Sequence, residues 1–153
     1  MVTLRPMTQA DYDQFAGAMW EDYAQVGARN SGMSIEDARA FAAKQRAELV
    51  PNELQTPGHR FWVVENAERQ RVGVLWVQLR DAQHLAFIYN IEMDPAERGK
   101  GYGRQALEAL EAEMRPLGIT KIGLNVFGDN TVAMRLYQSM GYQTVATNMQ
   151  KDI

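Results

Sequence analysis

The stretch IEMDPAERGKGYGRQALEAL, residues 91–110, decides the fold and suggests the chemistry. An apolar run turns at Pro95 and then passes three alternate glycines before apolar residues recur at helical spacing. Glycine lets the backbone approach a ligand closely because no Cβ stands in the way. N–H groups at a helix start lack intrahelical partners and carry partial positive charge, so they suit phosphate. Residues 98–104, the glycine loop, are therefore predicted to bind an anion, helped by Arg98, Lys100 and Arg104.

Three interpretations of the glycine loop compete. The first is a plain turn beside a solvated basic cluster. The second is a dinucleotide site, because residues 101–106 fit G-x-G-x-x-A. That motif should follow a strand directly and precede several more strand–helix units, yet an acidic turn precedes it here. The third is a site for a different phosphate-bearing cofactor. A Walker loop is excluded, because no G-K-[ST] occurs.

On either side of this stretch, segments with apolar residues at helical spacing are interspersed with segments at strand spacing. Toward the N-terminus, a short strand ending at Pro6 precedes two helices. The first helix starts at Thr8 and ends between Gly27 and Gly32, and the second starts at Ser34 and stops at Pro51. The remaining predicted elements are strands at 61–65, 72–79 and 84–93, a helix ending near 116–118, a strand at 120–127, a helix closed by Gly141, and a last strand at 142–147.

These elements predict an α/β (α+β) fold. Three successive strands joined by short turns indicate an antiparallel meander. The order β-α-α-β-β-β-α-β-α-β predicts a mixed, mainly antiparallel central sheet with helices on its faces. A length of 153 residues suits one domain, predicted to span 1–153.

Composition excludes several classes of protein. No cysteine is present, so disulfides, cysteine–zinc sites and cysteine nucleophiles are ruled out. With only two histidines, a histidine-based metal site is not expected, and no metal is predicted. A net charge of -3 and the lack of a basic run argue against nucleic acid. Apolar runs too short to span a membrane and an acidic N-terminal segment argue against membrane or secretory targeting, so the expected location is the cytoplasm.

Two signatures resemble the GNAT superfamily of N-acetyltransferases. Arg98-x-x-Gly101-x-Gly103 matches the family's R/Q-x-x-G-x-G/A pattern. Downstream, LNVFGDNTVAMRLYQSMGY resembles the family's second pattern, with matching positions at Asn130, Ala133, Leu136-Tyr137 and Gly141-Tyr142. The element order is also similar to that of the family. The resemblance implies acetyl-CoA as cosubstrate, whereas spacing alone implies only a phosphate ligand.

The resemblance also implies where the cofactor lies. In the family the strand before the glycine loop splays from the next strand, which places a wedge between residues 89–93 and 122–126. Backbone groups of Ile91 and Met93 are expected to pair with the pantetheine amides, and the Met93 N–H to hold the developing oxyanion. The other expected cofactor contacts are Arg98, Gly99, Lys100, Gly101, Tyr102, Gly103, Arg104, Asn125, Asn130, Ala133 and Tyr137.

Three side chains are candidates for proton transfer. The resemblance favours Tyr137 as the acid that protonates the leaving thiolate, although its spacing fits a core aromatic as well. Glu92, just before the glycine loop, is a candidate base if its side chain faces the acceptor. Strand alternation does not fix that direction, because a bulge in the strand would reset the alternation. The alternative for Glu92 is a surface or cofactor-facing carboxylate. Tyr89, acting through a bound water, is the rival base.

The expected reaction is direct attack of a primary amine on acetyl-CoA in a ternary complex. The expected acceptor is a small molecule or a protein amine. Neither nucleic acid nor a membrane is expected as a partner. The wall of the pocket that binds the acceptor is expected at residues 20–34 and 56–60, with Trp20, Tyr23, Phe61 and Trp62 as candidate lining residues. A homodimer is compatible with the family, although no residue requires one. The alternative function is a non-catalytic acyl-CoA-binding sensor or interaction module.

Overall fold

The computed structural model describes residues 1–153 and divides into two compact units, Met1–Gly123 and Leu124–Ile153. The first unit holds β1 (Thr3–Pro6), α1 (Gln9–Ser31), α2 (Ile35–Leu49), β2 (His59–Glu65), β3 (Arg71–Arg80), β4 (Leu85–Met93) and α3 (Tyr102–Met114). β5 (Lys121–Leu124) spans the boundary, and the second unit holds α4 (Thr131–Ser139). A single domain over 1–153 remains a prediction.

Side chains cap the N-termini of α1 and α2. Thr8 and Asp11 form a reciprocal capping box: the Asp11 N–H donates to Thr8 Oγ1 at 3.2 Å, and the Thr8 N–H donates to Asp11 Oδ2 at 2.9 Å. Ser34 Oγ accepts from the Asp37 N–H at 3.1 Å. Gly32, with a φ of 68°, ends α1 in the left-handed conformation. The predicted helix boundaries are therefore confirmed, except that α1 continues through Gly27.

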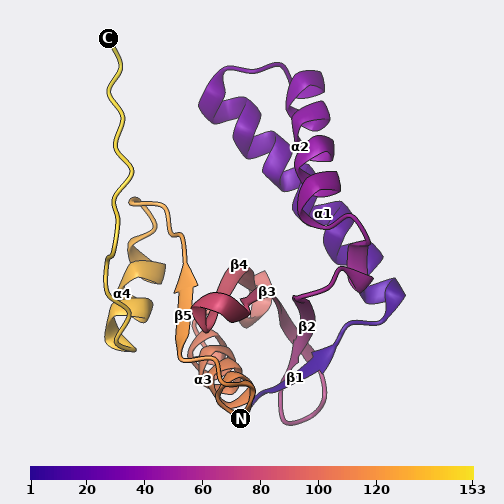
Figure 1. Ribbon diagram of the computed structural model, residues 1–153, viewed down its shortest axis with the longest axis vertical. Coiled ribbons are helices and arrows are strands. Elements are labelled where there is room, and N and C mark those ends of the chain that lie inside the picture. Colours follow the sequence, from indigo (N-terminus) through magenta and orange to yellow (C-terminus); the bar gives the residue numbers. More distant parts are fainter. The chain divides into compact units, whose positions relative to one another are not determined.

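The five strands form a mixed sheet in the order β1-β2-β3-β4-β5, in which the pairs β1–β2, β2–β3 and β3–β4 are antiparallel. Residues paired across such strands share a face. Phe61, Val63, Val74 and Trp76 form one buried cluster with the apolar residues of α1 and α2. α1 and α2 lie side by side as a helical hairpin (Figure 1). This helical pair therefore covers one face of the sheet.

The alternate residues of the central strands are buried as well. Val64, Leu75 and Val77 are fully buried although they point away from the α1–α2 side. α3 packs against β1 and β4 and buries Ala106, Leu107, Leu110 and Met114. Helices thus flank the sheet, and the predicted fold class is confirmed. No helix combines the length and the apolar character needed to cross a bilayer.

Several predicted details are wrong. The predicted last strand at 142–147 is absent: residues 142–153 form no strand, and Val145 and Met149 are exposed, because a strand needs a neighbour to bond its backbone groups. The predicted strand at 120–127 shortens to Lys121–Leu124. Tyr23, Phe41 and Leu117 follow the apolar spacing of the predicted helices and yet are exposed, because helical spacing does not show how wide the covered face of a helix is.

Candidate active site

The glycine loop connects β4 to α3 through a 3₁₀ turn at Pro95–Glu97. Gly99 and Gly101 have φ angles of 75° and 84°, in the left-handed region that other residues rarely adopt. Gly101 is the N-cap of α3, and no side chain caps this helix. Thr8, Ser34 and Asn130 cap α1, α2 and α4 with their side chains. The start of α3 therefore offers its first N–H groups to a partner from outside the helix.

Basic side chains of the loop pair with neighbouring acids. Arg98 Nε donates to the Met93 carbonyl at 3.1 Å, and Arg98 Nη2 lies 3.4 Å from Glu92 Oε1. Lys100 Nζ lies 3.0 Å from Glu97 Oε2. Arg98, Glu92 and Lys100 are more than half exposed, and such surface pairs contribute only about 0–1 kcal/mol to stability. An incoming anion can therefore recruit these cations at little cost.

The ladder between β3 and β4 determines the direction of the β4 backbone groups near the loop. Met93 pairs with Gly73 and Ile91 with Leu75, while the Asp94 N–H donates to the Val72 carbonyl at 2.8 Å. Hydrogen-bonded and non-hydrogen-bonded pairs alternate along an antiparallel ladder. Because Asp94 bonds to β3, Met93 and Ile91 occupy non-hydrogen-bonded positions. Their N–H and C=O groups point away from β3, toward the side of β4 that β5 occupies.

β5 lies beside only the beginning of β4. The N–H groups of Thr120 and Lys121 both donate to the His84 carbonyl, at 2.9 and 3.1 Å. A Cβ on Gly123 would lie 3.4 Å from Leu85 Cδ1 and 3.7 Å from Phe87 Cδ2. β5 ends at the next residue. Ile91 and Met93 therefore lie beyond the end of this strand.

Gly73 fixes the end of β4 by close packing. A Cβ at this position would lie 2.4 Å from the Glu92 carbonyl oxygen and 2.7 Å from Met93 Cε. Such distances are far below van der Waals contact, so any side chain here would displace β4. Gly73 could not be identified from the sequence, since a glycine within a predicted strand indicates only a close approach of some kind.

A β-bulge sets the orientation of the candidate base Glu92. The register between β3 and β4 shifts so that Trp76 pairs with Asn90 and Val77 with Ile88, leaving Tyr89 as the extra residue. Beyond the bulge, Glu92 pairs with Val74, which belongs to the cluster formed with α1 and α2. The exposed Glu92 side chain therefore lies on the α1–α2 face of the sheet, paired with Arg98.

Tyr89, the rival base, lies in a stack of aromatic rings. Its ring centroid is 4.8 Å from Trp76 and 6.1 Å from His59, both in stacked orientation. Tyr89 Oη donates to Gln78 Oε1 at 3.2 Å and accepts from Arg80 Nη2 at 3.3 Å. The hydroxyl is therefore anchored by two polar side chains on the neighbouring strand.

His59 belongs to the same stack and has a defined tautomer. Trp76 Nε1 donates to His59 Nδ1 at 2.9 Å, so the imidazole proton resides on Nε2. Burial lowers the pKa of His59, because the charged form would lose its hydration. His59 and Trp76 belong to no motif and were not predicted as site residues; the available signal was the alternation of His59 and Phe61 in β2, next to the single aromatic residue of β3.

The predicted site residues of the second unit lie on and before α4. Asn130 Oδ1 accepts from the Ala133 N–H at 3.2 Å, so these two residues form the start of this helix. Asn125 is exposed. Tyr137 is half-buried, its ring lies 5.5 Å from that of Tyr142, and burial raises its pKa. Tyr137 is therefore protonated at neutral pH.

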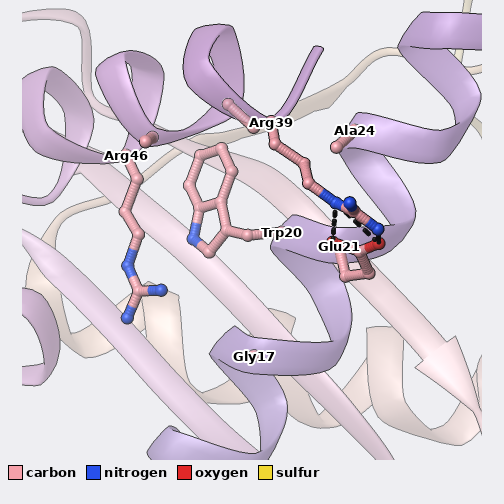
Figure 2. A pocket seen from close by; sticks show the side chains of 8 residues that line it. Gly17, Trp20, Glu21, Ala24, Arg39 and Arg46 are labelled. Carbon is pink, nitrogen blue, oxygen red and sulfur yellow. Dashed lines mark hydrogen bonds and ion pairs between the residues drawn. The ribbon is translucent and has the colours of Figure 1, made fainter. Parts of the chain in front are cut away.

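The predicted acceptor wall includes a cavity of about 300 Å³ between α1 and α2 (Figure 2). Trp20 lies in it between Arg39 and Arg46, and Arg39 is paired with Glu21 at 2.8 Å. No residue of the glycine loop lines this cavity. Tyr23 is exposed beside Trp20, whereas the adjacent Phe61 and Trp62 point to opposite faces of the sheet. The four candidate lining residues therefore do not converge on one pocket.

Comparisons with known proteins agree with this fold. The family model for the acetyltransferase (GNAT) family matches residues 20–142. The N-acetyltransferases YycN and YdgE of Bacillus subtilis are 32% and 31% identical, covering 99% of this chain and 99% and 98% of theirs. The crystal structure of YycN superposes with a TM-score of 0.91, covering 100% of this chain and 99% of that one.

A more distant solved structure shares the fold. The spermidine N-acetyltransferase of Vibrio cholerae, in complex with CoA and spermine, has a TM-score of 0.63 at 22% identity, covering 92% of this chain and 79% of that one. The family resemblance and the enzyme class predicted from the two signatures are confirmed by the family model and the two Bacillus relatives. The chain belongs to the GNAT family of acetyltransferases.

Proposed function

We propose that this enzyme transfers the acetyl group of acetyl-CoA to a primary amine by direct attack on the thioester in a ternary complex. The observation that carries the proposal is the start of α3. It follows β4 through two left-handed glycines, lacks a side-chain cap, and has basic residues on its loop. A diphosphate accepts the hydrogen bonds that a capping side chain would otherwise accept.

The proposed cofactor-binding site extends from the glycine loop along β4. The N–H groups near Gly101, Tyr102, Gly103 and Arg104 hold the diphosphate, with Arg98, Gly99 and Lys100 beside it. The backbone of Ile91 and Met93 binds the pantetheine as an added strand, because those groups point away from β3. The family pattern assigns further cofactor contacts to Asn125, Asn130, Ala133 and Tyr137. The complex of the Vibrio cholerae structure with CoA supports this cosubstrate.

Tyr137 acts as the proton donor to the departing sulfur. Its raised pKa keeps the hydroxyl protonated until the thiolate forms. A thiol has a pKa of about 8.5, so complete transfer from a tyrosine of higher pKa is uphill. The tyrosine therefore works best through a hydrogen bond that strengthens as negative charge develops on the sulfur.

Glu92 is the favoured base and Tyr89 the alternative. An alkylammonium with a pKa near 10.4 needs about 4–5 kcal/mol to lose its proton at neutral pH, so a proton acceptor is required. Glu92 lies on the α1–α2 face, just before the glycine loop, and becomes available when Arg98 turns to the phosphates. Tyr89 Oη already donates to Gln78, which makes it a weaker acceptor unless a water intervenes.

Release of CoA from acetyl-CoA across a panel of small-molecule and peptide amines tests this function. With an amine that reacts, Tyr137→Phe should lower kcat on the order of 100-fold while the Kd for acetyl-CoA stays unchanged. Unchanged turnover in this variant would remove Tyr137 from the mechanism. If acetyl-CoA binds but no amine on the panel releases CoA, the non-catalytic sensor becomes the better assignment.

A further inference from the structure

Arg80, the last residue of β3, has no carboxylate partner. Its Nε donates to Gln78 Oε1 at 3.2 Å, and its Nη2 donates to Tyr89 Oη at 3.3 Å. Its Cζ lies 4.4 Å from the centroid of the Phe87 ring. The side chain is half-buried. By contrast, the carboxylates of Asp11, Glu53 and Asp94 each pair with an arginine. Neutral groups alone therefore hold the Arg80 guanidinium in place.

The bonds that Arg80 makes leave one edge of the guanidinium available. A guanidinium carries five N–H donors in a planar fork. Gln78 and Tyr89 take one donor from Nε and one from Nη2, and their own hydrogen bond to each other closes this edge. Both donors of Nη1 and the second donor of Nη2 remain. Two parallel donors of this kind match the two oxygens of a carboxylate.

Charge also favours a carboxylate over a phosphate dianion. A half-buried cation without a counter-ion is partly stripped of water and gains by meeting an anion. Arg80 supplies a single positive charge, and the two polar groups that hold it, Gln78 and Tyr89, are neutral. A dianion placed here would keep one charge uncompensated, whereas a carboxylate would not.

The location connects Arg80 to the acceptor side of the sheet. Gln78 pairs with Phe87, and Tyr89 is the bulged residue stacked on Trp76, which belongs to the α1–α2 cluster. Glu92 lies on this same face. Tyr89 precedes Ile91 and Met93 by two and four residues, or about 7–13 Å along an extended strand. An amine at the thioester and an anion at Arg80 thus require a spacer of several bonds.

We propose that the acceptor is a primary amine carrying a carboxylate several bonds away, and that Arg80 binds this carboxylate through its free edge. This inference rests on the transferase function proposed above and names the substrate class. Gln78 and Tyr89 act as positioning residues, because they hold the guanidinium in a fixed orientation before the acceptor binds.

Paired acceptors test the proposal by CoA release. The probes are 4-aminobutyrate, 5-aminovalerate and 6-aminohexanoate, each compared with its carboxamide, and 3-aminopropylphosphonate as the dianionic analogue. The wild-type enzyme should prefer one carboxylate over its carboxamide on the order of 10- to 100-fold in kcat/KM. Arg80→Gln should remove this preference, so that the kcat/KM values of each carboxylate and its carboxamide become similar in the variant. Arg115→Gln, a matched change at an arginine paired with Glu111, should keep the preference.

Calorimetry with acetyl-CoA separates this proposal from the proposed function. Wild-type protein and Arg80→Gln should bind acetyl-CoA equally; lack of binding by both would refute the transferase function itself. If acetyl-CoA binds, equal rates with carboxylates and carboxamides, or a preference that survives in Arg80→Gln, would overturn the role of Arg80. A preference for the phosphonate would overturn the choice of carboxylate. If no probe reacts, calorimetric titration of the CoA-loaded enzyme decides, and absence of carboxylate binding overturns the proposal.

Discussion

The starts of α1 and α3 solve the same problem in opposite ways. Both helices begin with N–H groups that have no partner within the helix. At α1, the side chains of Thr8 and Asp11 each accept a hydrogen bond from the backbone N–H of the other residue, and Arg5 pairs with Asp11 at 2.9 Å. At α3, the N-cap is a left-handed glycine without a side chain. A helix start that is satisfied internally stabilises the fold, whereas one left open is suited to a ligand. The comparison predicts that changes at α3 affect binding and changes at α1 affect stability.

The largest effect is expected from Gly101→Val. A β-branched residue is strained at a φ of 84°, and its side chain blocks the approach of the diphosphate to the helix start. The Kd for CoA should rise on the order of 100-fold, or about 2.7 kcal/mol. Isothermal calorimetry checks this, with circular dichroism to show that the variant folds. Wild-type affinity in a folded variant would contradict the role assigned to α3.

Thr8→Ala should have the opposite profile. Loss of the N-cap hydroxyl leaves the Asp11 N–H without its acceptor and should lower the free energy of unfolding by about 1 kcal/mol. Urea denaturation measures this value, and calorimetry should find the Kd for CoA unchanged. A variant that keeps full stability would show that the α1 capping box is not formed in solution.

Gly27→Ala sharpens the comparison from within α1. Gly27 lies inside the helix with a normal φ, and a Cβ there would meet nothing within 4 Å. Alanine should therefore raise the free energy of unfolding by about 0.5–1 kcal/mol through the lower entropy of the unfolded chain. A stability loss in urea titrations would instead reveal a contact at this position.

The smallest effect is a pH dependence at the start of α1. Hydrogen bonds from Arg5 and then from the Thr8 N–H lower the pKa of Asp11 from 3.8 to about 2. Because the folded pKa is depressed, the stabilisation is complete above about 3.8 and is lost as the pH falls toward 2. Solvent screening limits it to about 0.5 kcal/mol. Thermal melts of wild type and Asp11→Asn should converge over this range; parallel curves would show that Asp11 is not held by these bonds.

The fold was predictable because its signals are local. Capping residues, strand alternation and the position of the glycine loop depend on neighbours in sequence, and the predicted helices and the meander follow from them. The last strand at 142–147 was wrong because strand formation depends on a partner that no local pattern reveals.

The site was predictable only where a motif marks it. The glycine loop carries its own signature, whereas the direction of Glu92 depends on the bulge at Tyr89, which alternation alone cannot locate. Arg80, Gln78 and Tyr89 meet across two strands, so their contact appears only once the register is known.

The short length of β5 has a consequence for the protein when it is empty. Beyond Leu124, β4 has no neighbouring strand at Ile91 and Met93, and the Met93 carbonyl accepts only from the Arg98 side chain; such an uncovered strand edge is where chains add to one another and aggregate. A pantetheine arm docked along it would shield that border as a surrogate strand. Acetyl-CoA would then raise the melting temperature, and the stabilisation would grow with the logarithm of its concentration once this exceeds the Kd. Amide hydrogens at residues 91 and 93 should accordingly exchange slowly with solvent only when the cosubstrate is present.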